Sequence, residues 1–208
     1  MDKDRKSSAK AQSLFTRMQA EEPDAGSLQG QLLIASPHIG DSRFDKTVIL
    51  MCQHNAESAM GLVLNRLATK LDLGELSKKL DIGSPRFHGT NPVHIGGPVE
   101  SNRGFVLHSQ DHMLPDSLPV TRDIGLTANI EILRDITDGI GPSQSIVSLG
   151  CAGWGAGQLE QEITENVWLS LPASPELVFE TKRPDLWQQS FDMLGIDPAY
   201  YAGASGNA

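Results

Sequence analysis

The sequence predicts an α+β domain with a largely antiparallel sheet, and three observations support this class. Short β-rich runs follow one another across brief turns more often than they alternate with helices, so hairpins outnumber strand–helix–strand units. The chain of 208 residues is long enough for one domain with a full core, and 39% hydrophobic and 21% charged residues are typical of a globular protein. No apolar run approaches the roughly 18 residues of a membrane helix, so no membrane association is expected.

The domain itself is expected to span residues 28–198. Residues 1–27 form an N-terminal extension, with a modest amphipathic helix over 7–20 followed by a polar linker. Residues 199–208 form a tail of small residues that is expected to be flexible. The N-terminus lacks the apolar core of a signal peptide, so a cytoplasmic location is expected.

The first half of the domain is expected to contain three strands and a helix. A continuous apolar run predicts a buried strand over 31–36. Two β-rich runs, 47–54 and 60–65, are joined by a short polar turn, which is the pattern of a hairpin. Leucines at helical spacing then predict a helix over 71–80.

The second half is expected to contain further strands and three helices. The predicted strands are 93–97 and 104–109, which flank a Pro/Asn/Gly loop as another hairpin, and then 118–126, 145–150, 167–171 and 176–180. The predicted helices are 130–136, 158–166 and 185–194, the last opened by Pro184 and ended by Gly195.

The most distinctive stretch of the chain is Ser148–Ile163, where an apolar strand runs into alternating glycines around a tryptophan and then into a helix. Glycine permits backbone conformations and close approaches that a Cβ forbids. Two interpretations stay open: Trp154, Gly155, Gly157 and Gln158 line a ligand pocket, or the motif is a structural corner that packs the indole into the core. No lysine or arginine lies within the motif, which disfavours a phosphate ligand.

Cys52 and His54 form the candidate catalytic pair. They lie two residues apart in a predicted strand, so their side chains are expected on the same face. An imidazolium lowers the pKa of a neighbouring thiol and produces a nucleophilic thiolate, which is the basis of Cys–His chemistry. The alternative is that Cys52 packs into the core, as free cysteines of apolar strands commonly do.

Asn65 and Arg66 follow an apolar strand and form a second candidate ligand site. A guanidinium fixed beside a strand end can recognise a carboxylate or a phosphate. A structural ion pair between Arg66 and Asp41 or Asp45 is the competing interpretation.

No metal site, cofactor or disulfide is predicted. His108 and His112 are four residues apart, but the predicted strand there does not provide the helical geometry of a zinc site. Gly96-Gly-Pro98 lacks the strand-to-helix context of a phosphate loop and is expected to be a bulge or turn. Cys52 and Cys151 lie in separate strand-like segments without a CxxC motif.

The charge distribution disfavours nucleic acid as a partner. Residues 1–29 carry five basic and five acidic residues, so residues 30–208 carry 12 basic against 21 acidic residues and account for the net charge of −9. Nucleic-acid affinity depends mainly on neutralising phosphates, and no helix-turn-helix is recognisable. Direct binding of duplex DNA is therefore not expected, and the partner is expected to be a protein or a small molecule.

The assembled segments resemble the YqgE/AlgH family of bacterial proteins. The matching blocks run collinearly from about residue 28 to 197 and are Gly30–Pro37, Phe44–Ile49, Cys52–Asn55, Gly61–Arg66, Gly96–Val99, Gly153–Glu160, Asn166–Trp168 and Leu186–Trp187. The resemblance implies an α+β fold in which a small closed β-barrel lies inside a branched sheet surrounded by helices. It implies a link to alginate regulation by name and carries no established activity. Cys151 differs from the tyrosine typical of this position in the family.

Two functions are carried forward. The first is a non-enzymatic, cytoplasmic binding or regulatory protein of the YqgE/AlgH type. The second is a thiol-dependent enzyme or redox sensor that uses Cys52 and His54. The reactivity of Cys52 separates them, because a low-pKa, accessible thiol favours the second function and an inert, buried one favours the first.

Overall fold

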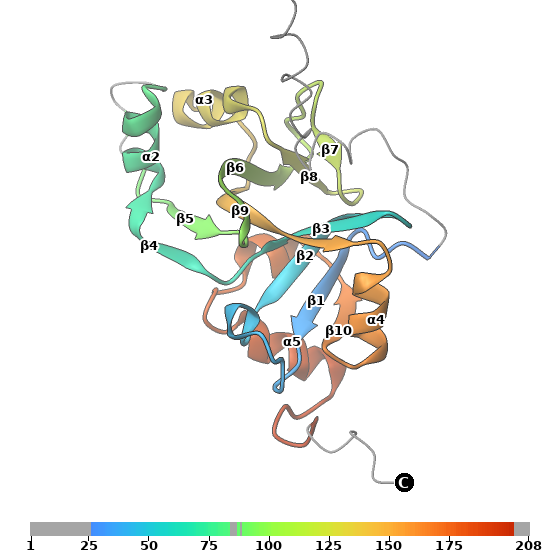
Figure 1. Cartoon of the computed structure of the whole chain (residues 1–208). Helices are drawn as coiled ribbons and strands as arrows, with labels where there is room; N and C mark the ends of the chain where they lie inside the picture. The colour runs from blue at the N-terminus through green and yellow to red at the C-terminus, as the bar shows by residue number, and fades with distance from the viewer. Residues whose placement is uncertain (1–25, 84–86, 88, 202–208) are drawn as a thin grey trace, which may run out of the picture.

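The computed structural model describes residues 26–83, 87 and 89–201, which are drawn in colour in Figure 1. The strands are β1 (Gln31–Ala35), β2 (Val48–His54), β3 (Ser58–Val63), β4 (Leu67–Asp72), β5 (Pro92–Ile95), β6 (Val99–Ser109), β7 (Leu118–Pro119), β8 (Ile124–Thr127), β9 (Ser145–Gly155) and β10 (Trp168–Pro172). The helices are α2 (Leu73–Leu80), α3 (Ile130–Asp138), α4 (Gln158–Thr164) and α5 (Leu186–Leu194), with a 3₁₀ turn η1 (Ser42–Phe44) and a π-helical turn η2 (Glu176–Glu180). The expected helix over 7–20 and the tail from 202 onward lie outside the described residues.

The strands form one ten-stranded sheet, which confirms the α+β class and its mostly antiparallel character. The order is β10-β1-β2-β3-β9-β6-β8-β7, with β5 attached to β9 and β4 attached to β5. Only the β5–β9 pairing is parallel among these strands. The sheet branches at β9, where Ser148 pairs with His94 of β5 and with Phe105 of β6.

The sheet curls, but its pairings do not close into the small barrel that the resemblance implied. Among the described strands the main path runs openly from β10 to β7. Each end strand finishes at a proline, Pro172 or Pro119, which lacks the N–H needed to extend a ladder. The curl is evident in the core, because Leu32 of β1 and Leu126 of β8 belong to one hydrophobic cluster. In the sheet order, four strands lie between β1 and β8: β2, β3, β9 and β6.

The main core fills the concave side of the curled sheet and is covered by α5 and η2. Fully buried Leu50 and Leu62 belong to it together with Phe191 of α5. Trp187 adds a polar tie, because its indole N–H donates to the Ala35 carbonyl oxygen across 2.8 Å. This bond fixes α5 against the end of β1.

Two smaller cores lie on the side of the sheet that faces away from the main core. One packs Leu33, Ile49 and Met51 against α4, so β1 and β2 are buried on both faces, as their continuous apolar runs predict. The other lies between β5, β6, β9 and helices α2 and α3. Figure 1 accordingly shows α2 and α3 at one end of the molecule and α4 and α5 at the other.

Several local predictions require correction. The segments 93–97 and 104–109 do not form a hairpin, because β9 lies between β5 and β6. The segment 118–126 is a small hairpin of β7 and β8 rather than one strand. Residues 176–180 are helical: Thr181 N–H donates to the Glu176 carbonyl oxygen, closing a π turn behind Pro175. Strand β4 was not predicted.

The Gly96–Pro98 segment is the connection between β5 and β6, and it explains why glycine is needed there. Gly97 has φ +152°, and a Cβ at this position would overlap the backbone of Cys151. The chain therefore crosses β9 at a separation that leaves no room for a side chain. This agrees with the expected turn.

Candidate functional site

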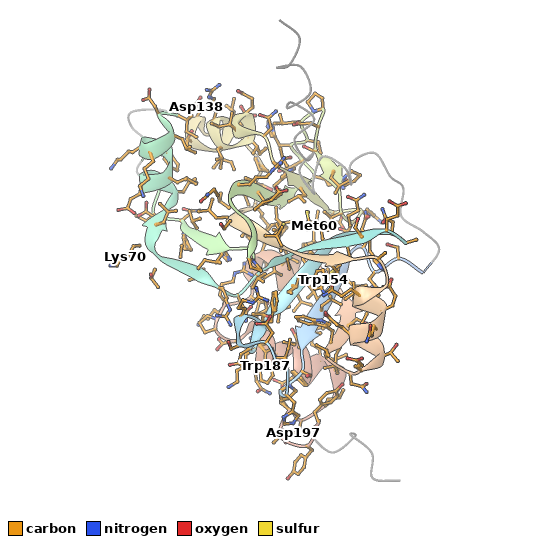
Figure 2. The ribbon with its side chains drawn as sticks, viewed as in Figure 1. Met60, Lys70, Asp138, Trp154, Trp187 and Asp197 are labelled. Atoms are coloured by element: carbon orange, nitrogen blue, oxygen red, sulfur yellow. The ribbon has the colours of Figure 1, made fainter. Side chains whose placement is uncertain are left out.

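A cavity of about 300 Å³ lies where the end of β9 meets α4, β10 and the η1 loop. The side chains that define it are Phe44, Trp154, Gln158, Glu162 and Trp168, and we call it the tryptophan pocket. Figure 2 shows Trp154 at the β9 end beside α4, away from Trp187 on α5. A volume of this size is at the lower end of the range for small-molecule sites.

Glu162 is the polar centre of the tryptophan pocket. Its Oε2 accepts the indole N–H groups of Trp154 at 2.9 Å and Trp168 at 2.7 Å. Its Oε1 accepts the Gln158 side-chain amide at 2.9 Å. Because an ionised carboxylate accepts about four hydrogen bonds, these three donors leave acceptor capacity for one more group.

Three aromatic rings line the same cavity at steep mutual angles. Trp154 and Trp168 meet edge to face, with centroids 6.1 Å apart and planes at 79°. Phe44 meets Trp168 at 5.7 Å and 74°. Both indoles are buried, so the rings are walls fixed by packing rather than mobile surface side chains.

The rim of the tryptophan pocket carries one ion pair on the η1 loop. Arg43 Nε and Nη2 donate to the Asp41 carboxylate, and Arg43 N–H donates to the same carboxylate across 2.9 Å. The side-chain bonds from Arg43 are the main reason that the pKa of Asp41 lies below its usual value. The guanidinium also lies 5.9 Å from the centroid of Phe44.

The sequence builds this site through the junction of β9 and α4. Gly157 adopts φ +71° immediately before α4 and turns the chain into the helix. Gln158 then reaches back to accept the Gly155 N–H at 3.1 Å and forward to Glu162, four residues along the helix. Of the residues predicted together as ligand residues, Trp154 and Gln158 line the pocket, whereas Gly155 and Gly157 belong to the turn beside it.

Both interpretations of Trp154 describe part of its environment, since the indole packs in the core beside α4 and also lines the cavity. The sequence did not predict three further parts of the site, which are Glu162, Phe44 and Trp168. The i, i+4 spacing of Gln158 and Glu162 was the available signal for Glu162.

Asn65 and Arg66 lie at the other end of β3 and do not join the tryptophan pocket. Asn65 accepts the Val48 N–H at 3.0 Å and donates to the Lys46 carbonyl oxygen at 2.8 Å. Arg66 Nη2 donates to the backbone oxygen of Asp45 at 3.0 Å, in place of the carboxylate contact expected in the structural interpretation. Both side chains tie β3 to the loop before β2.

Cys52 and His54 do not share a face, which corrects the prediction made from strand alternation. A register shift between Met51 and Gln53 inserts a β-bulge into β2, and a bulge interrupts the alternation of side chains. Cys52 is fully buried in the main core, where burial raises the pKa of its thiol. Cys151 is buried in the same core, and burial raises its pKa to about 12.

His54 instead faces α4 and the start of the described chain. The Leu28 N–H donates to its Nδ1 at 3.0 Å, so the ring carries its proton on Nε2 and donates to Glu160 Oε1 at 2.7 Å. These residues line a second cavity of about 540 Å³. The arrangement fixes His54 as a structural bridge between the Leu28 backbone and Glu160, and it does not place the imidazole beside the Cys52 thiol.

No group of three or more His, Cys, Asp and Glu side chains with metal-binding geometry occurs among residues 26–83, 87 and 89–201. His108 Nε2 bonds to Thr127 Oγ1 at 2.8 Å, and His112 Nε2 bonds to Asp135 Oδ2 at 2.7 Å. In the same part of the chain, no helix has the length and apolar character needed to cross a membrane.

Comparison with known proteins relates the chain to one family. A sequence model described as AlgH-like matches residues 32–199. The chain is 47% identical over 189 residues to a UPF0301 protein of Beijerinckia indica, covering 87% of this chain and 92% of that protein. It is 44% identical over 183 residues to a UPF0301 protein of Rhodospirillum rubrum, covering 88% and 95% of the two chains.

Two solved structures share the architecture. The solution structure of the AlgH protein from Pseudomonas aeruginosa aligns with a TM-score of 0.73 at 34% identity, covering 90% of this chain and 100% of that chain. A crystal structure of a protein from Corynebacterium diphtheriae aligns with a TM-score of 0.65 at 20% identity, covering 85% and 92%, and supports the fold alone.

Proposed function

The chain belongs to the AlgH-like family, and from this premise we propose that it is a non-enzymatic binding protein with a regulatory role. Its ligand is a small molecule held in the tryptophan pocket. The single observation that carries the proposal is the Glu162 carboxylate, fixed by two indole N–H groups inside an aromatic cavity. Rigid apolar walls around a few precisely held polar groups are characteristic of small-molecule sites.

A regulatory role is supported by where the pocket lies. Its walls come from the η1 loop, the end of β9, α4 and the start of β10, which are separate parts of the chain. A ligand that contacts all of them stabilises one arrangement of this surface relative to others. If a partner protein recognises that arrangement, the free energies of ligand binding and partner binding are coupled. The partner then responds to the ligand.

The thiol-enzyme alternative receives no support from the arrangement of the described residues. Cys52 is fully buried, its pKa is raised by burial, and its polar neighbours are the Leu50 carbonyl oxygen, the Leu62 backbone and Cys151. A reactive cysteine requires an accessible, electropositive environment. We therefore keep the binding function as the conclusion.

Nuclear magnetic resonance of the indole N–H groups tests this proposal directly. The three tryptophans give three indole signals, and Trp187 serves as an internal reference because it packs in the main core and its N–H is bonded to the Ala35 carbonyl oxygen. We expect the small-molecule fraction of host cells to shift the Trp154 and Trp168 signals and to leave the Trp187 signal in place. The proposal is wrong if the two pocket signals do not move, or if all three move together.

A further inference from the structure

We propose that the ligand of the tryptophan pocket carries an organic cation, of the methylated or alkylated ammonium type. This inference rests on the proposed function and specifies the chemistry of its ligand. It depends on the charge of the pocket, on the arrangement of its rings and on its size.

The charge of the pocket is the first step. Asp41, Arg43 and Glu162 are the ionisable side chains that line it. Arg43 is bonded to Asp41 through both Nε and Nη2, so these two charges compensate each other. Glu162 remains, and the donors that hold it are neutral: two indoles and one amide.

Within the described part of the chain, no lysine, arginine or histidine forms an ion pair with Glu162. A partly buried carboxylate without a cationic partner is costly, and a ligand cation lowers that cost. Neutral hydrogen-bond donors orient the carboxylate without cancelling its charge. The pocket is thus electrostatically complementary to a cation and would repel an anion.

The aromatic rings provide the second step. Phe44 and Trp154 both stand nearly perpendicular to Trp168, which produces three sides of a box around one cavity. The face of an aromatic ring carries negative charge density and attracts cations, most strongly for tryptophan. Boxes of this kind recognise quaternary ammonium groups, whose charge is spread over methyl groups that also need apolar contact.

Size favours a small ligand over an extended one. The cavity of about 300 Å³ accommodates an ammonium group with a short substituent. The substituent would extend past the rim formed by the Asp41–Arg43 pair, whose side chains are partly exposed.

Choline and 3,3-dimethylbutan-1-ol test the inference, because the second compound replaces the charged nitrogen of the first with carbon at nearly unchanged shape. Each is titrated into the full chain while the indole N–H signals are followed. We expect choline to shift the Trp154 and Trp168 signals at millimolar concentration or below, with the neutral compound weaker by about tenfold. The Trp187 signal should not move.

Two variants of α4 locate the charge that is responsible. Glu162→Gln removes the negative charge but keeps an oxygen that accepts indole N–H groups, and it should abolish the preference for choline. Glu165→Gln is the matched control, because Glu165 accepts from Gln161 at i, i+4 as Glu162 does from Gln158, yet it does not line the pocket. It should leave the preference unchanged. Dispersed indole signals in each variant verify that it folds.

The outcomes separate this inference from the proposed function. Equal binding of both compounds, or a choline preference that survives Glu162→Gln, overturns the cation while leaving a pocket that binds ligands. No response to choline also overturns it, even where the host extract shifts Trp154 and Trp168. No response to choline or to the extract overturns both proposals.

Discussion

Cys52 is buried in the main core, and its environment predicts an unreactive thiol. Burial raises its pKa, so almost no thiolate exists near neutrality, and the side chain has no exposed surface. We expect alkylation of the native protein at pH 7 to be slow and limited by opening of the fold. Mass spectrometry of the peptide that contains Cys52, sampled over time and over a pH series, measures this rate.

His54→Ala is the control for the thiol prediction. Because the bulge in β2 places His54 toward α4, its removal should not change how the intrinsic reactivity of Cys52 depends on pH. Fast modification with an apparent pKa below about 7, lost in His54→Ala, would restore the catalytic pair. Denatured protein should react quickly and sets the upper limit of the rate.

Gly157 adopts a left-handed backbone conformation at the turn into α4. Its φ of +71° lies in the left-handed region, where a β-branched side chain collides with its own backbone. We expect Gly157→Val to lower the free energy of unfolding by about 1–3 kcal/mol, measured by urea denaturation. It should also weaken ligand binding, because Gln158 and Glu162 follow the turn.

Gly155→Val is the matched comparison two residues earlier. Gly155 ends β9 in extended conformation, and a Cβ there would meet no heavy atom within 4 Å. We expect Gly155→Val to change the free energy of unfolding by no more than about 0.5 kcal/mol. The two glycines appear equivalent in the sequence, and equal destabilisation by both substitutions would contradict the assignment of the turn to Gly157.

The candidate site was predictable from the sequence only where its residues are consecutive. Trp154 and Gln158 were found because they lie in one glycine-rich motif. Trp168 and Phe44 were missed as site residues because the fold brings them to the pocket from β10 and the η1 loop. The prediction that Cys52 and His54 share a face was wrong for another reason. Side chains alternate along a strand only while the ladder is regular, and the inserted residue places the side chains that follow it on the other face.

At the scale of elements, local pairings were predictable and long-range ones were not. The β2–β3 hairpin and helices α2, α3 and α5 follow from turns, leucine spacing and caps that are present in the local sequence. The predicted β5–β6 hairpin failed because β9 enters between the two strands from about 40 residues further along the chain. β4 was missed because its exposed, mixed residues show no clear alternation.

His94 connects β5 to the chain segment after β3, and it predicts how stability depends on pH. Its Nδ1–H donates to the Leu64 carbonyl oxygen at 2.8 Å, and burial lowers its pKa to about 4. The unfolded chain, with a histidine pKa near 6.5, binds a proton before the folded protein does. The contribution of His94 to the free energy of unfolding is therefore fully present above about pH 6.5, and about 3 kcal/mol of it is lost as the pH falls toward 4.

His94→Asn isolates this contribution, because the asparagine amide can still donate to Leu64 but does not titrate. We expect the variant to be less stable at pH 7.5 and to lose less stability than the native protein between pH 6.5 and 4.5. Urea denaturation at a series of pH values measures how the free energy of unfolding of each protein depends on pH. Parallel curves for the two proteins would show that other groups control the acid sensitivity.

At the scale of the whole molecule, the curled sheet separates three cores and leaves the tryptophan pocket at the edge of one of them. The concave core is closed by α5 and η2, whereas the α4 side is shared between packing and the cavity. Figure 1 shows α4 at the end of the molecule opposite α2 and α3. A ligand at α4 can therefore act on its local surface without opening the main core.

The net charge of the molecule leads to the last prediction, that the protein does not bind duplex DNA in a sequence-specific manner at physiological salt. Residues 30–208 carry 12 basic against 21 acidic residues. Binding to DNA requires several phosphate contacts from Lys and Arg, and repulsion from a net charge of −9 opposes each encounter. Fluorescence anisotropy with labelled duplexes should show only weak binding that disappears as salt is raised. A submicromolar, salt-resistant and sequence-dependent signal would contradict this, and repeating it with Arg43→Ala and Arg66→Ala would identify the basic residues responsible.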